Sequence, residues 1–279
     1  MAQRDSDVVL FLGDFPYTKT GSLTEIRDGH QAIRSVPGFR SLTSATPTLA
    51  IWDDHDFGPN DADGTHSHAA EALRGFQEHW PNPARMPGAG EGIYATYTIG
   101  DVEMFLLDGR YSARHGGPQS TLLGEAQNQW LRERLKRSDA RYKLLVSGTP
   151  FARRKKDAWA SRNHRAERDR LFAFLAKEKV TGVLAVSGDI HRTDIYRLPL
   201  PDGRGLYNFV SSPLGQRHRP SLPSERFNEG VLYSHGEPNM FGEMEFFPAG
   251  RDTAVVMRVC SASSGLIHEC VLKPAELGL

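Results

Sequence analysis

Residues 48–60 read TLAIWDDHDFGPN, and this stretch joins a predicted buried strand to a dense group of charged side chains. The run 49–52 (LAIW) is short and apolar, as in strands that are buried on both faces. The polar run 53–56 (DDHD) follows it at once. Carboxylates crowded at the end of a buried strand repel one another and lose hydration, so protons or a cation must neutralise them. The stretch therefore predicts a metal site at the end of the strand.

The same pattern recurs at three other predicted strands. Each is an apolar run that ends in acidic, imidazole or guanidinium side chains. The runs and the residues after them are 8–12 with Asp14, 102–107 with Asp108 and Arg110, and 183–186 with Asp189 and His191. Because ligands bind at the carboxyl ends of strands in open α/β sheets, we expect these segments to meet in one site.

Several further elements can be predicted from periodicity and from turn residues. Helical spacing indicates helices, and Pro37-Gly38 is expected to break the first of them before the strand that begins at Thr48. Gly100-Asp101 indicates a hairpin within 92–107. The predicted helices are 23–35, 69–80, 123–136 and a fourth that ends at 171–176, and the other predicted strands are 142–146, 244–247, 254–259 and 266–272.

Length and composition favour a single α/β domain over residues 1–279. The 34 Lys and Arg balance the 34 Asp and Glu, so the net charge gives no signal for a nucleic-acid partner. No run approaches the ~18 apolar residues of a membrane span, and residues 1–6 lack the apolar core of a secretory signal. As written, the chain is expected to be cytoplasmic. Cys260 and Cys270 are expected to be reduced.

A basic run at 153–156 (RRKK) leads into an arginine-rich segment that ends at Arg170, which raises a nucleic-acid alternative. We favour a solvated loop and helix face, because Asp157, Glu167 and Asp169 dilute the positive charge. The sequence has no glycine-rich nucleotide loop, no H-E-x-x-H and no G-x-S-x-G, which argues against dinucleotide, nucleoside triphosphate, zincin and α/β-hydrolase sites.

The candidate ligands are oxygen and imidazole donors on separate strands, namely Asp14, Asp54, Asp189 and His191. Such a set suits hard or borderline cations such as Fe, Mn, Zn or Ca. With a bridging carboxylate it can hold two metals about 4 Å apart, a geometry suited to hydrolysis of a phosphate ester.

Three further residues are candidates for this site. His55 could donate a proton to the leaving oxygen, or could instead bond to Asp54 or pack under Trp52. Arg110 could bind phosphate oxygens in a bidentate manner. Tyr17 either packs or serves as a phenolate ligand. These alternatives stay open at the level of the sequence.

The motifs together resemble those of PhoD-type alkaline phosphatases, which belong to the calcineurin-like metallophosphoesterase superfamily. The similarity covers almost the whole chain in the same order as in the family. The matching segments are GDFPY at 13–17 (G-D-x-x-Y), WDDHD at 52–56 (W-D-D-H-[DE]), DGR at 108–110 (D-x-R), LGEAQNQWL at 123–131 (L-G-x-x-Q-x-x-W-L), DAW at 157–159, SGDIH at 187–191 (S-G-D-x-H) and Ser212-Pro213.

This resemblance implies a fold and an activity. The fold is a four-layer sandwich, with two mixed β-sheets flanked by helices, and the reaction is hydrolysis of phosphomonoesters or phosphodiesters. Asp14 is implied as the acid that bridges two metals, with Tyr17, Asp189 and His191 as further ligands. Asp54 takes the place of the superfamily's Asn ligand, although Asp53 is an alternative, and His55 follows as the acid.

One feature of the family has no counterpart here. The family begins with an additional strand and a metal-binding Asp or Cys ahead of G-D-x-x-Y, and Asp14 comes too early in this sequence for that strand. The resemblance therefore implies either a chain that is truncated at its N-terminus or an incomplete metal position. In the second case, the alternative function is a catalytically weakened module that binds metal or phosphate. The family's export signal would also lie upstream.

Overall fold

The computed structural model describes residues 4–83, 91–152, 157–221 and 230–279. Its largest sheet has seven strands in the order β3-β4-β5-β6-β8-β7-β9. The neighbours β4, β5, β6 and β8 run parallel, whereas β3, β7 and β9 are antiparallel to their neighbours. The strands are β3 (Ala95–Ile99), β4 (Val102–Leu106), β5 (Tyr142–Ser147), β6 (Val183–Ser187), β7 (Thr193–Pro199), β8 (Gly205–Val210) and β9 (Val231–His235).

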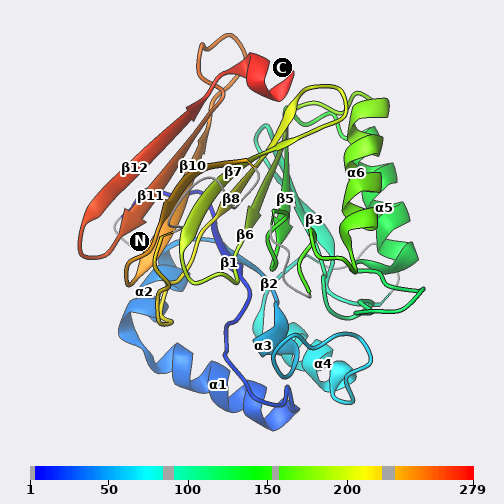
Figure 1. Cartoon of the computed structure of the whole chain (residues 1–279). Helices are drawn as coiled ribbons and strands as arrows, with labels where there is room; N and C mark the ends of the chain where they lie inside the picture. The colour runs from blue at the N-terminus through cyan, green and yellow to red at the C-terminus, as the bar shows by residue number, and fades with distance from the viewer. Residues whose placement is uncertain (1–3, 84–90, 153–156, 222–229) are drawn as a thin grey trace.

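Two smaller sheets are also present. A parallel pair consists of β1 (Val9–Leu12) and β2 (Thr48–Ile51). An antiparallel sheet consists of β10 (Met240–Phe246), β11 (Val255–Ser261) and β12 (Gly265–Leu272). In Figure 1 the three-stranded sheet lies across the large sheet from α5 (Gly124–Arg137) and α6 (Arg165–Lys177). Among the described residues the other α-helices are α1 (Leu23–Ser35), α2 (Pro37–Ala45), which leads into β2, α3 (Asp54–Phe57), which follows β2, and α4 (Ala69–His79).

The large sheet separates two apolar cores because side chains alternate along its strands. Leu144 and Val146 of β5 join the core that contains β1, β2 and the antiparallel sheet. Leu145, between them, joins the core beneath α5 and α6. A strand buried on both faces has no polar side to mark it, which explains the continuous apolar runs in the sequence.

The predicted sandwich of sheets flanked by helices is confirmed, but its second sheet is divided. Within the described residues, β1 is paired with β2 only, and β10 with β11 only. A cavity of about 1170 Å³ is lined by residues of both β1 and β10 and by the inner side chains Met104, Leu144 and Phe209. No hydrogen-bonded ladder therefore joins these two edges.

Most local predictions agree with the structure to within a few residues, but α2, β7, β8 and β9 were not predicted. Pro37-Gly38 ends α1 as expected, but Pro37 then opens the unpredicted helix α2. Proline suits the first helical position because its fixed φ is already helical and its missing N–H has no partner there.

Three other sequence predictions concern features away from the site. Cys260 and Cys270 are both free thiols, as predicted. The basic run 153–156 lies outside the described residues. Across the described part of the chain, no helix has the length and apolar character needed to cross a bilayer.

Candidate active site

Asp14 lies in the turn that directly follows β1. Gly13 precedes it with φ +94°, and a Cβ on Gly13 would lie 2.6 Å from Cβ of Asp53, so glycine is needed where the two segments meet. Asp14 also has a left-handed backbone, with φ 58°. Its Oδ1 accepts a hydrogen bond of 3.2 Å from the backbone amide of His55. The first strand end is thereby joined to the start of α3.

Asp56 also links the turn after β1 to the start of α3. Its side chain accepts hydrogen bonds from the backbone amides of Asp53 and Phe15, and the second of these is 3.1 Å long. Burial raises the pKa of Asp56 to about 7, although these amides oppose the rise. Asp56 is therefore an internal brace between the two motifs.

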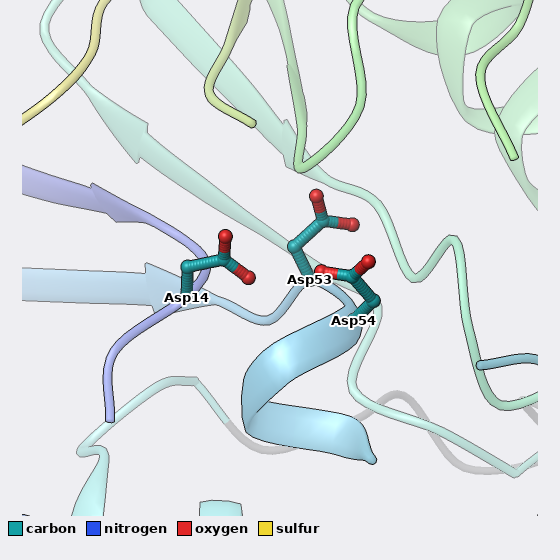
Figure 2. Close-up of side chains that lie close together, drawn as sticks. All are labelled: Asp14, Asp53 and Asp54. Atoms are coloured by element: carbon teal, nitrogen blue, oxygen red, sulfur yellow. The ribbon is translucent and has the colours of Figure 1, made fainter. Parts of the chain in front are cut away.

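Two groups of carboxylates lie close enough to share a cation. Among the residues that the structure describes, Asp14, Asp53 and Asp54 form one group, and Asp54, Asp61 and Asp157 form the other. Within each group the oxygen atoms lie within 4.8 Å of one another. Figure 2 shows the first group, with Asp14 reaching from the turn after β1 toward Asp53 and Asp54 at the start of α3. Asp54 belongs to both groups and joins them.

The pKa values of these carboxyls reflect burial and mutual repulsion. Burial raises the pKa of Asp14 well above its usual range, and the nearby Asp54, Asp56 and Asp189 raise it further. Burial also raises the pKa of Asp53 well above the usual range despite the opposing charge of Arg110. At Asp54 burial is outweighed by Arg110 and by a hydrogen bond from the Asp61 amide, so its pKa is lowered.

The oxygen atoms of Asp14, Asp53 and Asp54 suit a hard or borderline cation. Without a cation, part of the Asp14–Asp53–Asp54 group must hold protons because the acids are too close to ionise together. Carboxylate oxygens that converge within 4.8 Å are the donors that such ions prefer. A bound cation would replace the protons, so these residues could hold a metal ion.

Arg110 is paired with two acids of the candidate site. The side chain is completely buried, and its Nε donates to Oδ1 of Asp53 at 2.8 Å. Its Nη2 donates to Asp53 and, at 2.8 Å, to Asp157, while Nη1 donates to the carbonyl of Ala62 at 3.1 Å. The guanidinium thus orients two candidate ligands instead of facing a substrate. The predicted contact with phosphate finds no support in this geometry.

Asp108, which begins the same motif, is a framework residue. Its Oδ1 accepts hydrogen bonds from the indole Nε1 of Trp52 at 2.8 Å and from the backbone amides of Arg110 and Tyr111. Its Oδ2 accepts a bond from the Ile93 amide at 2.9 Å. These bonds hold the indole of Trp52, the residue that directly precedes the acidic run 53–56. Asp108 therefore stabilises the backbone around the site and is not one of the candidate ligands.

Asp189 and His191 lie at the end of β6 and line the same cavity as Asp14 and Tyr17. Both have left-handed backbones, with φ 68° and 56°. Such conformations in residues other than glycine cluster at functional sites. Asp189 is close enough to raise the pKa of Asp14, but neither residue belongs to the two carboxylate groups. Their roles as metal ligands stay predictions.

Tyr17 and His55 form a stacked pair at the edge of the site, with ring centroids 3.7 Å apart. Nδ1 of His55 lies 3.4 Å from the carbonyl oxygen of Thr18. Trp52 contacts the rings of Phe57 and Phe76, and the charge of His55 is close enough to Asp54 to contribute to the lowered pKa of that carboxyl. The role of His55 stays a prediction. Tyr17 is 44% exposed.

Two acids of the second group were not predicted as site residues. Asp61 follows α3 with φ 57°, and its amide donates to Oδ2 of Asp54 at 2.7 Å. Asp157 appears in the sequence only as part of a motif. Its D-A-W context was the one available signal, whereas the location of Asp61 depends on how the chain turns after α3.

Comparison with known proteins identifies the family. A family model for PhoD-like phosphatase matches residues 1–231. Alkaline phosphatase D of Bacillus subtilis (strain 168) is 27% identical over 247 residues, which cover 68% of this chain and 42% of that protein. This chain therefore spans less than half the length of that curated relative.

Two solved structures share the fold. A structure of PhoD has a TM-score of 0.74 at 19% identity and covers 96% of this chain and 67% of its own. Purple acid phosphatase PPD1 from yellow lupin (Lupinus luteus) seeds has a TM-score of 0.66 at 13% identity and covers 96% of this chain and 47% of its own. The match of the family model over most of the chain, together with this fold, shows that the chain belongs to the PhoD-like phosphatase family.

Proposed function

We propose that this chain hydrolyses phosphate esters with the help of bound metal ions. The observation that carries the proposal is the convergence of Asp14, Asp53 and Asp54 within 4.8 Å at the ends of β1 and β2. Asp14 and Asp189 both line one cavity of the structure. Membership of the PhoD-like phosphatase family supports the same reaction class.

We further propose two ions, drawn from Fe, Ca, Mn and Zn. The two carboxylate groups share Asp54, so one could hold an ion through Asp14 and Asp53 and the other through Asp61 and Asp157. When bound, such ions supply positive charge that stabilises the reacting phosphoryl group and activates water. The choice among the four metals follows only from the oxygen-rich donor set.

His55 is the residue best placed to handle the proton of the leaving group. Its Nδ1 faces the Thr18 carbonyl, which can only accept a hydrogen bond, so Nδ1 carries a proton. The other ring nitrogen, Nε2, is the atom that would donate a proton to a leaving oxygen. The stack with Tyr17 limits rotation of the ring. This arrangement suits a general acid.

Metal analysis of the purified protein, paired with hydrolysis assays, tests the proposal. A nitrophenyl phosphomonoester and a bis-nitrophenyl phosphodiester would each be assayed with Fe, Mn, Zn and Ca. We expect bound metal and turnover of at least one ester, both lost in Asp54→Ala. Stoichiometric metal without hydrolysis of either ester would refute the enzymatic role, and a protein that binds none of the four metals would refute the site.

A further inference from the structure

The two carboxylate groups are negatively charged, so they cannot bind an anionic phosphate without a cation. Arg110 is the guanidinium bonded to these acids, and it is buried and occupied by Asp53 and Asp157. Metal ions offset the acids but do not give the directed hydrogen bonds that phosphate oxygens accept from guanidinium groups. An arginine from another segment near the strand ends would supply such hydrogen bonds.

The segment 211–221 follows β8 and is fastened to the same strand ends. The amide of Ser211 donates to the carbonyl of Ser187, the last residue of β6, at 2.9 Å. Further along, the carbonyl of Pro213 accepts a hydrogen bond of 2.8 Å from the Met240 amide at the start of β10. Ser212 is buried and Leu214 is 41% exposed, so the segment emerges from the core here.

Two hydrogen bonds then bring the segment back to His191. Nδ1 of His191 lies 3.0 Å from the carbonyl oxygen of Arg217, and the Arg219 amide donates to the His191 carbonyl at 2.7 Å. Because a carbonyl only accepts, Nδ1 is the donor in the first of these bonds. The segment thus orients the candidate ligand, as partners of metal-bound histidines commonly do.

The backbone between these two bonds carries three consecutive basic side chains, Arg217, His218 and Arg219, and all three are exposed. Within the described ranges, the guanidinium groups of Arg217 and Arg219 form no ion pair. The carbonyl oxygen of Arg219 would lie 1.8 Å from a Cβ on Gly236, so a close backbone contact also holds this end of the segment. Backbone contacts thus hold the main chain of this segment beside His191, and its basic side chains are exposed.

We propose that Arg217 and Arg219 bind the non-bridging oxygens of the substrate phosphate, in the role that the sequence suggested for Arg110. This inference rests on the proposed function. It assigns substrate recognition to a loop beside His191 and leaves Arg110 to orient the acids. A guanidinium offers two parallel N–H donors to a phosphate, which lysine cannot reproduce.

Binding of inorganic phosphate to the metal-loaded protein tests the proposal independently of turnover. Isothermal titration calorimetry would compare the wild type with Arg217→Ala, Arg219→Ala and Arg217→Lys. Loss of a charge-assisted contact weakens binding by about 10- to 100-fold, so we expect that loss in at least one alanine variant and a partial loss in the lysine variant. In ester assays the same variants should raise KM more than they lower kcat.

Arg251→Ala is the matched control, because Arg251 is an exposed arginine between β10 and β11. It should bind phosphate like the wild type. Metal content should stay unchanged in the alanine variants, since the contacts with His191 use only backbone atoms of the loop.

Unaltered phosphate affinity in both alanine variants would overturn the proposal, as would a metal-loaded wild type that does not bind phosphate. Loss of metal in the variants would also overturn it, because the arginines would then act by assembling the site. If the wild type binds phosphate but hydrolyses no ester, the proposed function fails while the titration still decides the role of the arginines.

Discussion

Oδ1 of Asp14 accepts a hydrogen bond of 3.2 Å from the backbone amide of His55, and this bond links the turn after β1 to the first residues of α3. Residues 41 positions apart in the sequence thereby define the centre of the site. The contact uses the carboxylate as an acceptor, which an amide side chain can also be. Charge at Asp14 can therefore be removed while this link is kept.

Asp14→Asn should weaken the response of stability to metal without unfolding the protein. A metal present at a hundredfold excess over Kd stabilises the wild type by about 2.7 kcal/mol. The variant should gain much less, yet in chelator it should be at least as stable as the wild type because repulsion from Asp54, Asp56 and Asp189 is relieved. Thermal melts in EDTA and in each metal provide the measurement. Equal metal-dependent shifts in both proteins would exclude Asp14 as a ligand.

His55→Ala should slow hydrolysis most for esters whose leaving group is strongly basic, because such a group leaves only when it is protonated. An alkyl phosphate releases a basic alkoxide and should lose about 10²- to 10⁴-fold in kcat/KM, whereas a nitrophenyl ester should lose far less. Both substrates would be measured with metal content checked. Equal losses would remove His55 from the catalytic residues.

Arg110→Ala should act mainly on stability, because it leaves Asp53 and Asp157 buried without their counter-ion. Breaking a buried pair by removing one partner typically costs about 3–5 kcal/mol. Urea denaturation would measure this loss, with Arg251→Ala as an exposed control that should change stability by no more than about 0.5 kcal/mol. Unchanged stability with a raised KM for phosphate esters would restore the direct role that the sequence suggested.

Stability should fall as the solution is acidified below pH ~6.5, partly because of His30. Burial lowers the pKa of His30 to about 3, with the neighbouring His79 adding to the effect across a stack of 4.1 Å. Below pH 6.5 the unfolded chain binds a proton at His30, whereas the folded chain does not until about pH 3. The stability that the neutral, buried His30 contributes is therefore fully present above pH 6.5 and is lost as the pH falls toward 3.

The slope from this one group is at most about 1.4 kcal/mol per pH unit. His30→Leu should flatten the profile of unfolding free energy between pH 6.5 and 4, whereas the exposed His218→Leu should not. An identical profile for wild type and His30→Leu would contradict the assignment.

The location of the site was predictable because its signals are local. A buried strand followed directly by glycine and an acid, as at Gly13-Asp14 and Gly188-Asp189, can be found without knowledge of the fold. The parallel order β4-β5-β6 then brings strand ends to one edge of the sheet. Local patterning likewise placed α1, α4 and α5 to within a residue or two, since each has apolar positions at helical spacing.

The sequence by itself therefore determined which residues end the strands, and with them the acidic character of the site. Only the tertiary structure decided the partners of those residues. Arg110 lies 57 positions from Asp53 and 47 from Asp157, and whether it meets a substrate or these acids depends on long-range packing. The same holds for Asp61 beside Asp54 and for the separation of β1 from β10. No local pattern encodes such contacts, because they arise only when distant segments are buried together.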